Sequence, residues 1–242
     1  MTVDRWGQAV RQQLGLGRLL PLGGPGDGAW ITEPAARAAL SRAVEEVRGV
    51  RLGALRLDLA DPEAADEPAV PAPPSALPPG PLRIEAQCAA TAEEPLPAAA
   101  GRLRDALARA ARDRLGLVIA EVDLQVTALL DEDPAPQEDE AEPSEPEPAG
   151  KQSAEGDEGR VAEAALAVPG VVRLTGSLGG LGRAVHIESR PAEAAASLPR
   201  RHVRVELAVS PDARALDVAR AVREAVATAL ADGPTVAVLV TR

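Results

Sequence analysis

Four blocks of sequence recur in the same order in the two halves of this 242-residue chain, and this recurrence limits the fold more than any other feature. The matched pairs are VRGV at 47–50 with VPGV at 168–171, LRIEAQC at 82–88 with VRVELAV at 203–209, RDAL at 104–107 with REAV at 223–226, and residues 122–127 with 236–241. Their offsets are 121, 121, 119 and 114 residues. Alanine-rich helices resemble one another by chance, but strand blocks do so less readily, so we infer an internal duplication.

The predicted elements also follow one order in both halves. The first half is predicted to hold a helix over 32–48, strands over 52–59 and 82–88, a helix over 97–115 and a strand over 117–127. The second half is predicted to hold a helix over 158–168, strands from 171, over 184–189 and over 203–209, a helix around 223–226 and a strand over 236–241. Thr32 is the expected cap of the first helix. The pattern predicts an α+β fold of two related small modules, each helix-strands-helix-strand, with two helices packed on one face of a small antiparallel or mixed sheet.

Two proline-rich stretches are predicted to be unfolded. Residues 60–81 contain eight prolines, which exclude helix and central strand and favour extended chain. Residues 131–158 contain twelve acidic residues, one lysine and five prolines, so this stretch alone carries the whole formal net charge of −11. Like charges repel there and oppose folding.

These stretches give the expected domain plan. It consists of an N-terminal amphipathic segment at 1–30, a first module at 31–130 with the proline-rich insert 60–81, an acidic linker at 131–157, and a second module at 158–242.

The composition argues against several classes of function. The chain has no Phe, no Tyr and only two Trp, so it lacks the aromatic faces on which bases and sugars stack. Outside the acidic stretch it is neutral, and no net positive field would attract nucleic acid. No run of 18 apolar residues and no signal peptide are recognisable, so we expect a cytoplasmic protein without a spanning helix.

Residues with catalytic or metal-binding potential are few. The only histidines, His186 and His202, lie in or beside strands without zinc spacing, and the single cysteine, Cys88, is expected to be a buried, unreactive thiol. The glycines within 176–182 lie between two strands, which predicts a hairpin turn and not a phosphate-binding loop. We therefore predict no catalytic residue, no cofactor and no metal site. An enzyme whose second half-site comes from another chain is a weaker alternative.

The N-terminal segment carries the candidate interaction residues. Trp6, Val10 and Leu14 recur at helical spacing beside three arginines, and Trp30 is the other tryptophan of the chain. The segment can pack on the first module, dock on a partner, lie on a membrane surface or be disordered. The sequence alone does not decide between these interpretations of the N-terminal segment.

The second half resembles a known family. The stretches GRVAEAALAVPGVVRLTGS, GRAVHIES, VRVELAVSPDARALDVARAVREAVATAL and TVAVLV are similar to the alkaline-shock-protein family of envelope stress response proteins, and residues 159–242 cover the family pattern throughout. Residues 31–130 resemble it more faintly, and their proline-rich insert departs from it. The resemblance implies a small α+β module that acts through protein contacts at the cytoplasmic side of the envelope.

Together these features predict a non-enzymatic cytoplasmic interaction or scaffold protein that binds a protein partner or itself. The alternative is a peripheral membrane-surface protein held by residues 1–22 at the inner face of the cell membrane. Nucleic acid and small-molecule substrates are not expected.

Overall fold

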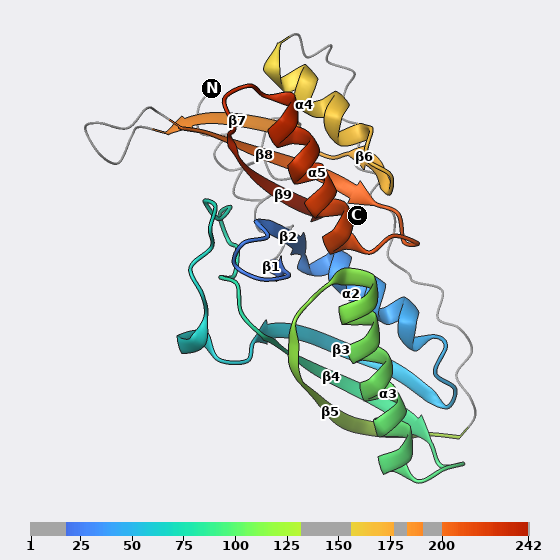
Figure 1. Ribbon diagram of the computed structural model, residues 1–242. Helices are drawn as coiled ribbons and strands as arrows, with labels where there is room; N and C mark the ends of the chain where they lie inside the picture. The colour runs from blue at the N-terminus through green and yellow to red at the C-terminus, as the bar shows by residue number, and fades with distance from the viewer. Residues whose placement is uncertain (1–17, 132–155, 177–182, 191–199, 242) are drawn as a thin grey trace, which may run out of the picture.

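The computed structural model describes residues 18–131, 156–176, 183–190 and 200–241, which form an α+β fold with four α-helices and two sheets (Figure 1). The helices are α2 (Glu33–Val44), α3 (Leu96–Ala110), α4 (Asp157–Leu166) and α5 (Ala215–Ala229). The strands are β1 (Leu19–Leu22), β2 (Ala29–Thr32), β3 (Val50–Leu59), β4 (Leu82–Thr91), β5 (Ile119–Leu130), β6 (Val171–Leu174), β7 (Val185–Arg190), β8 (Arg200–Val209) and β9 (Thr235–Thr241). Short helical turns add Pro62–Ala64 and Ala111–Leu115.

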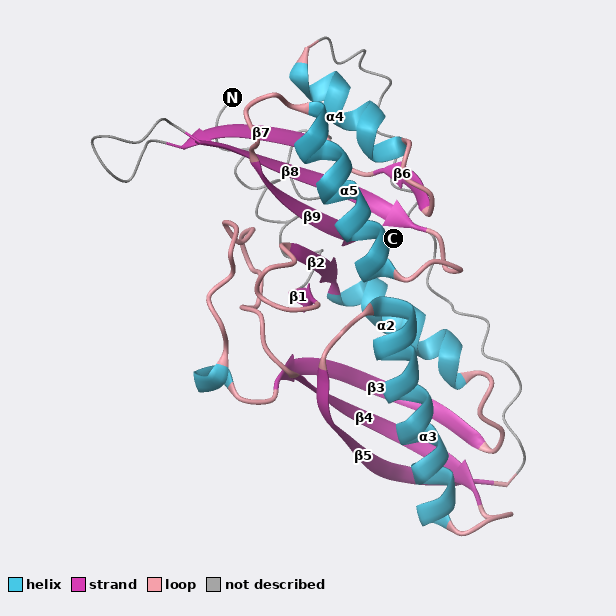
Figure 2. Cartoon of the chain, in the orientation of Figure 1, coloured by secondary structure: helices cyan, strands magenta, loops and turns pink. Residues whose placement is uncertain are grey.

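Each sheet is mixed and is covered by two helices, as Figure 2 shows. In the first sheet, of order β3-β4-β5, β3 runs antiparallel and β5 parallel to β4. In the second, β6 and β7 run antiparallel to β8, β9 runs parallel to it, and the β1–β2 hairpin continues the sheet beyond β9. Helices α2 and α3 cover the first sheet, and α4 and α5 cover the second.

The strand registers show how positions in the two halves correspond. Ile84 of β4 pairs with Val122 of β5, and Val203 of β8 pairs with Val236 of β9. Residues that are 119 positions apart therefore hold equivalent positions in β4 and β8. The predicted match of LRIEAQC with VRVELAV assumes an offset of 121 and is wrong by two residues. A shift of two keeps every side chain on its face, so the apolar pattern could not reveal the error.

The turns that begin β3 and β6 are also alike. Gly49 and Gly170 both have positive φ, at 70° and 93°. The Gly49 carbonyl accepts a hydrogen bond from the Thr91 N–H, and the Gly170 carbonyl accepts one from the Ser210 N–H, each over 2.9 Å. A left-handed glycine thus joins the end of a helix to the strand in each half.

The hairpin predicted for the glycine-rich segment is wrong. β6 ends at Leu174 and β7 begins at Val185, and both pair with the same edge of β8. β6 and β7 therefore run in the same direction along β8 and do not form a hairpin with each other. At the corresponding place in the first half, the register of β3 shifts between Leu52 and Leu55. Residues 177–182 themselves lie outside the described part of the chain.

Residues 60–81, predicted to be unfolded, pack on the second sheet. Val70 is buried in a cluster with Leu19 and Trp30. Leu77 donates its N–H to the Leu19 carbonyl over 2.8 Å and accepts the Trp30 indole N–H over 3.2 Å. Proline blocks helix and central strand, but apolar residues between the prolines still let an extended segment bury surface.

The N-terminal prediction also needs correction within the described residues. Leu19, Leu20 and Leu22, in the predicted amphipathic segment 1–30, belong to β1 and are fully buried, so this part of the segment is not a surface helix. β2 then leads directly into α2. Thr32 is the cap residue of α2, but its side chain makes no capping hydrogen bond, because its β-strand position places it in the core.

The two halves pack against each other. Buried side chains of both sheets and of all four described helices belong to one contiguous hydrophobic core. Arg214 donates to the Arg112 carbonyl over 3.0 Å, and the Gly23 N–H donates to the Gly116 carbonyl over 3.0 Å. The acidic stretch from 132 to 155 lies outside the described residues.

Candidate functional site

The outer edge of β5 is a free strand edge in the described part of the chain. β5 is the last strand of its sheet, and no described strand pairs with its outer side. Two of its apolar side chains face solvent: Val126 is 37 % and Leu129 is 63 % exposed. A strand edge of this length offers unpaired N–H and C=O groups to another chain.

The open face of the first sheet adjoins this edge. This face, opposite α2 and α3, carries a hollow of about 440 Å³. The hollow is lined by Ala54, Leu55, Arg56, Glu85, Ala86, Gln87, Asp123, Leu124 and Gln125. The last three belong to β5, so the hollow opens beside the free edge.

The charges on this face are unbalanced. Arg83 is shared by three carboxylates: it is hydrogen-bonded to Glu121, and it lies 3.6 Å from Asp123 and 4.0 Å from Glu85. The hydrogen bond to Glu121 is the main reason that the pKa of Arg83 is raised. Arg56 of β3 lies opposite Glu85 in the strand register, so beside β5 the two carboxylates of Glu121 and Asp123 share Arg83 and leave an excess of one negative charge.

The corresponding edge in the second half is occupied. β2 pairs in parallel with β9, with Ala29, Trp30 and Ile31 opposite residues 238–240. The N–H of Val238 donates to the Gly28 carbonyl over 3.0 Å. At the end of this pairing Val240 is 3 % exposed, whereas Val126, its counterpart in β5, is 37 % exposed. β2 and the helix α2 that follows it both pack on β9, and no described strand takes the place of β2 beside β5.

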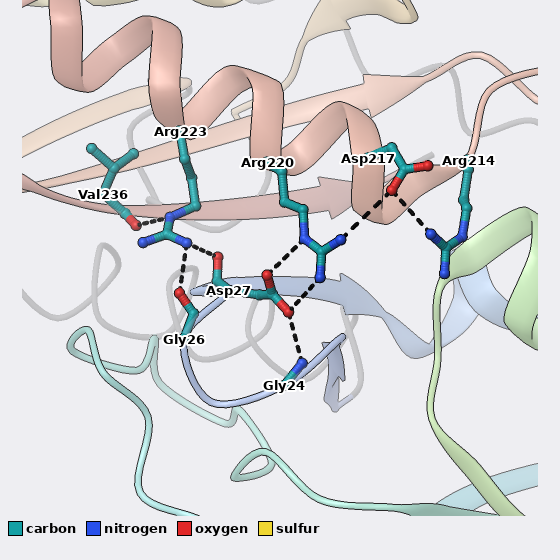
Figure 3. A network of polar contacts seen from close by, with 8 residues as sticks. All are labelled: Gly24, Gly26, Asp27, Arg214, Asp217, Arg220, Arg223 and Val236. Carbon is teal, nitrogen blue, oxygen red and sulfur yellow. Dashed lines mark hydrogen bonds and ion pairs between the residues drawn. The ribbon is translucent and has the colours of Figure 1, made fainter.

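A network of polar contacts fixes the β1–β2 hairpin to α5 (Figure 3). Arg220 makes two hydrogen bonds with Asp27, over 2.7 and 3.1 Å. Arg223 donates through Nε to the Val236 carbonyl over 3.1 Å and through Nη1 to the carbonyls of Gly26 and Asp27. Burial raises the pKa of Asp27, but the hydrogen bonds from Arg220 and from the Gly24 N–H outweigh it, so that this pKa is lowered.

The first half contains the counterpart of Arg223. Arg104 of α3 donates through Nε to the Val122 carbonyl over 3.1 Å, the same distance that joins Arg223 to Val236. Arg104 is exposed, and in the described part of the chain that contact is its one hydrogen bond. The counterpart of Arg220 is Gly101, so the ion pair with Asp27 has no equivalent.

The predicted interaction residues are placed differently. Trp6, Val10 and Leu14 lie outside the described residues. Trp30 is 1 % exposed and belongs to the core, so it is not a surface contact residue. Its burial follows from its place between the β9 edge and the proline-rich insert, a pairing of distant segments that local spacing does not reveal.

The other residues weighed from the sequence also have structural places. Cys88 is buried under the helices, and burial raises the pKa of its thiol. His202 lies 2.9 Å from the Thr235 hydroxyl through Nδ1, and His186 lies 3.0 Å from the Arg183 carbonyl through Nε2. Burial, followed by the charge of nearby Arg204, lowers the pKa of His186.

The chain matches no protein family model, no curated protein and no solved structure. In the described residues, no helix is long and apolar enough to cross a membrane, and no three His, Cys, Asp or Glu side chains are grouped as metal ligands.

The β5 edge was missed at the level of sequence. Alternation over 117–127 predicts a half-buried strand, but it does not say whether a neighbour lies on each side. The one available signal is the predicted duplication, because it makes β5 and β9 comparable once their neighbours are known.

Proposed function

We propose that this chain is a non-enzymatic scaffold that binds a protein partner by accepting a strand on the outer edge of β5. The observation that carries the proposal is the contrast between Val126 and Val240, which hold corresponding positions on an open and on a filled edge. Strand addition uses main-chain hydrogen bonds for affinity and alternate side chains for specificity.

The resemblance of residues 159–242 to envelope stress response proteins supports the same class of role. We extend the proposal to a scaffold in that response, on the cytoplasmic side of the envelope. The membrane-surface alternative is weakened, because Leu19, Leu20 and Leu22, which lie within residues 1–22, are buried in β1.

The edge can be tested with a backbone substitution. The counterpart of Val238 is Leu124, so the Leu124 N–H points to the open edge. Leu124→Pro removes that donor, at a place where a strand tolerates proline because no ladder bond is lost. Leu124→Ala, which keeps the N–H, is the matched control.

The measurement is NMR titration of the full chain with short β-branched peptides, following backbone amides of β5. We expect shift changes along residues 122–129 for the native chain and for Leu124→Ala, and a loss of at least about tenfold in affinity for Leu124→Pro. If none of the peptides shifts the β5 amides of the native chain, the proposal is wrong.

A further inference from the structure

The filled edge of β9 shows how a strand would be oriented on β5. There the added strand is parallel, and the carbonyls of Gly26 and Asp27, just before β2, are held by Arg223. Arg104 occupies the corresponding place on α3 and makes the same contact with the strand below it. Its remaining N–H groups therefore lie where the carbonyls of an incoming parallel strand would arrive.

The side chains of β5 define what the incoming strand must present. Leu124 packs against the core, and Val126, two residues further, lies on the same face of the sheet but is partly exposed; on that face the partner should carry apolar residues, as β2 does with Ala29 and Ile31. Glu121 and Asp123 lie on the open face and share Arg83, whereas Glu85 lies opposite Arg56 in the register of β3 and β4. On that face the partner should carry positive charge, because like charges directly opposite are destabilising.

This charge pattern argues against two occupants from the same chain. Pairing of β5 with β5 of a second copy would bring Glu121 and Asp123 of both copies onto one face. The acidic stretch 131–158 has no apolar alternation and would add further negative charge. Each would oppose binding through repulsion.

We propose that the β5 edge binds an extended partner segment that alternates apolar and basic residues, runs parallel to β5 and places its leading carbonyls on Arg104. This inference rests on the proposed function and adds the chemistry and direction of the partner.

Three matched peptides test it by fluorescence anisotropy with the full chain: acetyl-GGVRVRVT-amide, and the same peptide with glutamine or with glutamate in place of both arginines. We expect the arginine peptide to bind roughly fivefold tighter than the glutamine peptide, and the glutamate peptide to bind most weakly, since exposed ion pairs are modest in strength. Raising the salt concentration should remove the difference.

Variants separate the parts of the proposal. Asp123→Asn should reduce the preference for arginine over glutamine without abolishing binding of the glutamine peptide. Arg104→Ala should weaken all three peptides, whereas Arg109→Ala, an exposed arginine on the same helix that donates to the Asp105 carbonyl, should leave them unchanged. A spin label on the peptide N-terminus should broaden amides near residue 120 and not those near 129.

The outcomes distinguish the two proposals. If the arginine and glutamine peptides bind β5 equally, or the label broadens residues near 129, this inference fails while strand addition stands. If no peptide binds β5, both fail. Thermal unfolding of each variant, compared with the native chain, checks that the fold is retained.

Discussion

Gly116 lies directly against the side chain of Leu216, and this contact joins the first half of the chain to α5. Gly116 ends the helical turn after α3 with φ at +86°. A Cβ atom there would overlap the Leu216 side chain, and few residues adopt that backbone conformation. The contact therefore requires glycine for two independent reasons.

Gly116→Ala should lower the free energy of unfolding by about 2–4 kcal/mol, because it combines backbone strain with overpacking. Urea denaturation measures the change. Gly101→Ala is the control, since Gly101 lies within α3 with no other atom near the position of a Cβ. It should stabilise the chain by about 0.5–1 kcal/mol. Similar effects at both sites would show that Gly116 does not hold the halves together.

Asp27→Asn should make the chain less stable at neutral pH, and the difference from the native chain should shrink in acid. The pKa of Asp27 is lowered in the folded state. Its ion pair with Arg220 therefore stabilises the fold above the pKa of the unfolded chain, and that contribution is lost as the pH falls through the lowered folded pKa. Urea midpoints at pH 7 and pH 2.5 give the comparison. Asp212→Asn, at an exposed position, should show no such pH dependence; a parallel shift at both pH values for Asp27→Asn would contradict the assignment.

Cys88 should react with iodoacetamide on the order of 100-fold more slowly in the folded chain than in urea at the same pH. The thiol is buried, and burial raises its pKa, so both access and the thiolate fraction are reduced. Mass spectrometry of the alkylated chain over time gives the two rates. Equal rates would mean that β4 is not covered by α2 and α3.

Trp30→Ala should lower the free energy of unfolding by about 3–5 kcal/mol, as expected for a large buried side chain. The indole also loses its hydrogen bond to Leu77, which ties residues 60–81 to the second sheet. Urea denaturation followed by circular dichroism measures the loss. A residue whose role was surface contact would change stability by no more than about 0.5 kcal/mol, and such a result would refute its place in the core.

Local sequence patterns predict most of the helices and strands, but they do not predict which of these elements pair or pack with one another. The alternation of Val122, Leu124 and Val126 predicts strand β5, and the apolar spacing around Leu103 and Leu107 predicts α3, because both signals depend on residues close in sequence. The pairing of β2 with β9 joins residues about 210 positions apart, so the local sequence of neither strand predicts that the two will pair. The leucines of β1 have a spacing that also suits a helix, and only their pairing with β2 decides between the two.

The candidate site shows the same limit. The acidic residues of β5 are visible in the sequence, but the hollow beside them needs β3, β4 and β5 side by side. Arg104 is one of many exposed arginines, and its relevance emerges only from the matching contacts of Arg104 with Val122 and of Arg223 with Val236. The role proposed for Arg104 is therefore found by comparison with Arg223, and the local sequence around Arg104 does not provide that comparison.

The pairing of β2 with β9 also has a consequence during synthesis on the ribosome. Residues 19–32 are made early, but their partner strand at Thr235–Thr241 emerges only after some 200 further residues. At about 5–20 residues per second, the nascent hairpin waits roughly 10–40 s with its leucines and Trp30 uncovered on one side. The second sheet therefore closes only late in translation, after its β9 strand has emerged.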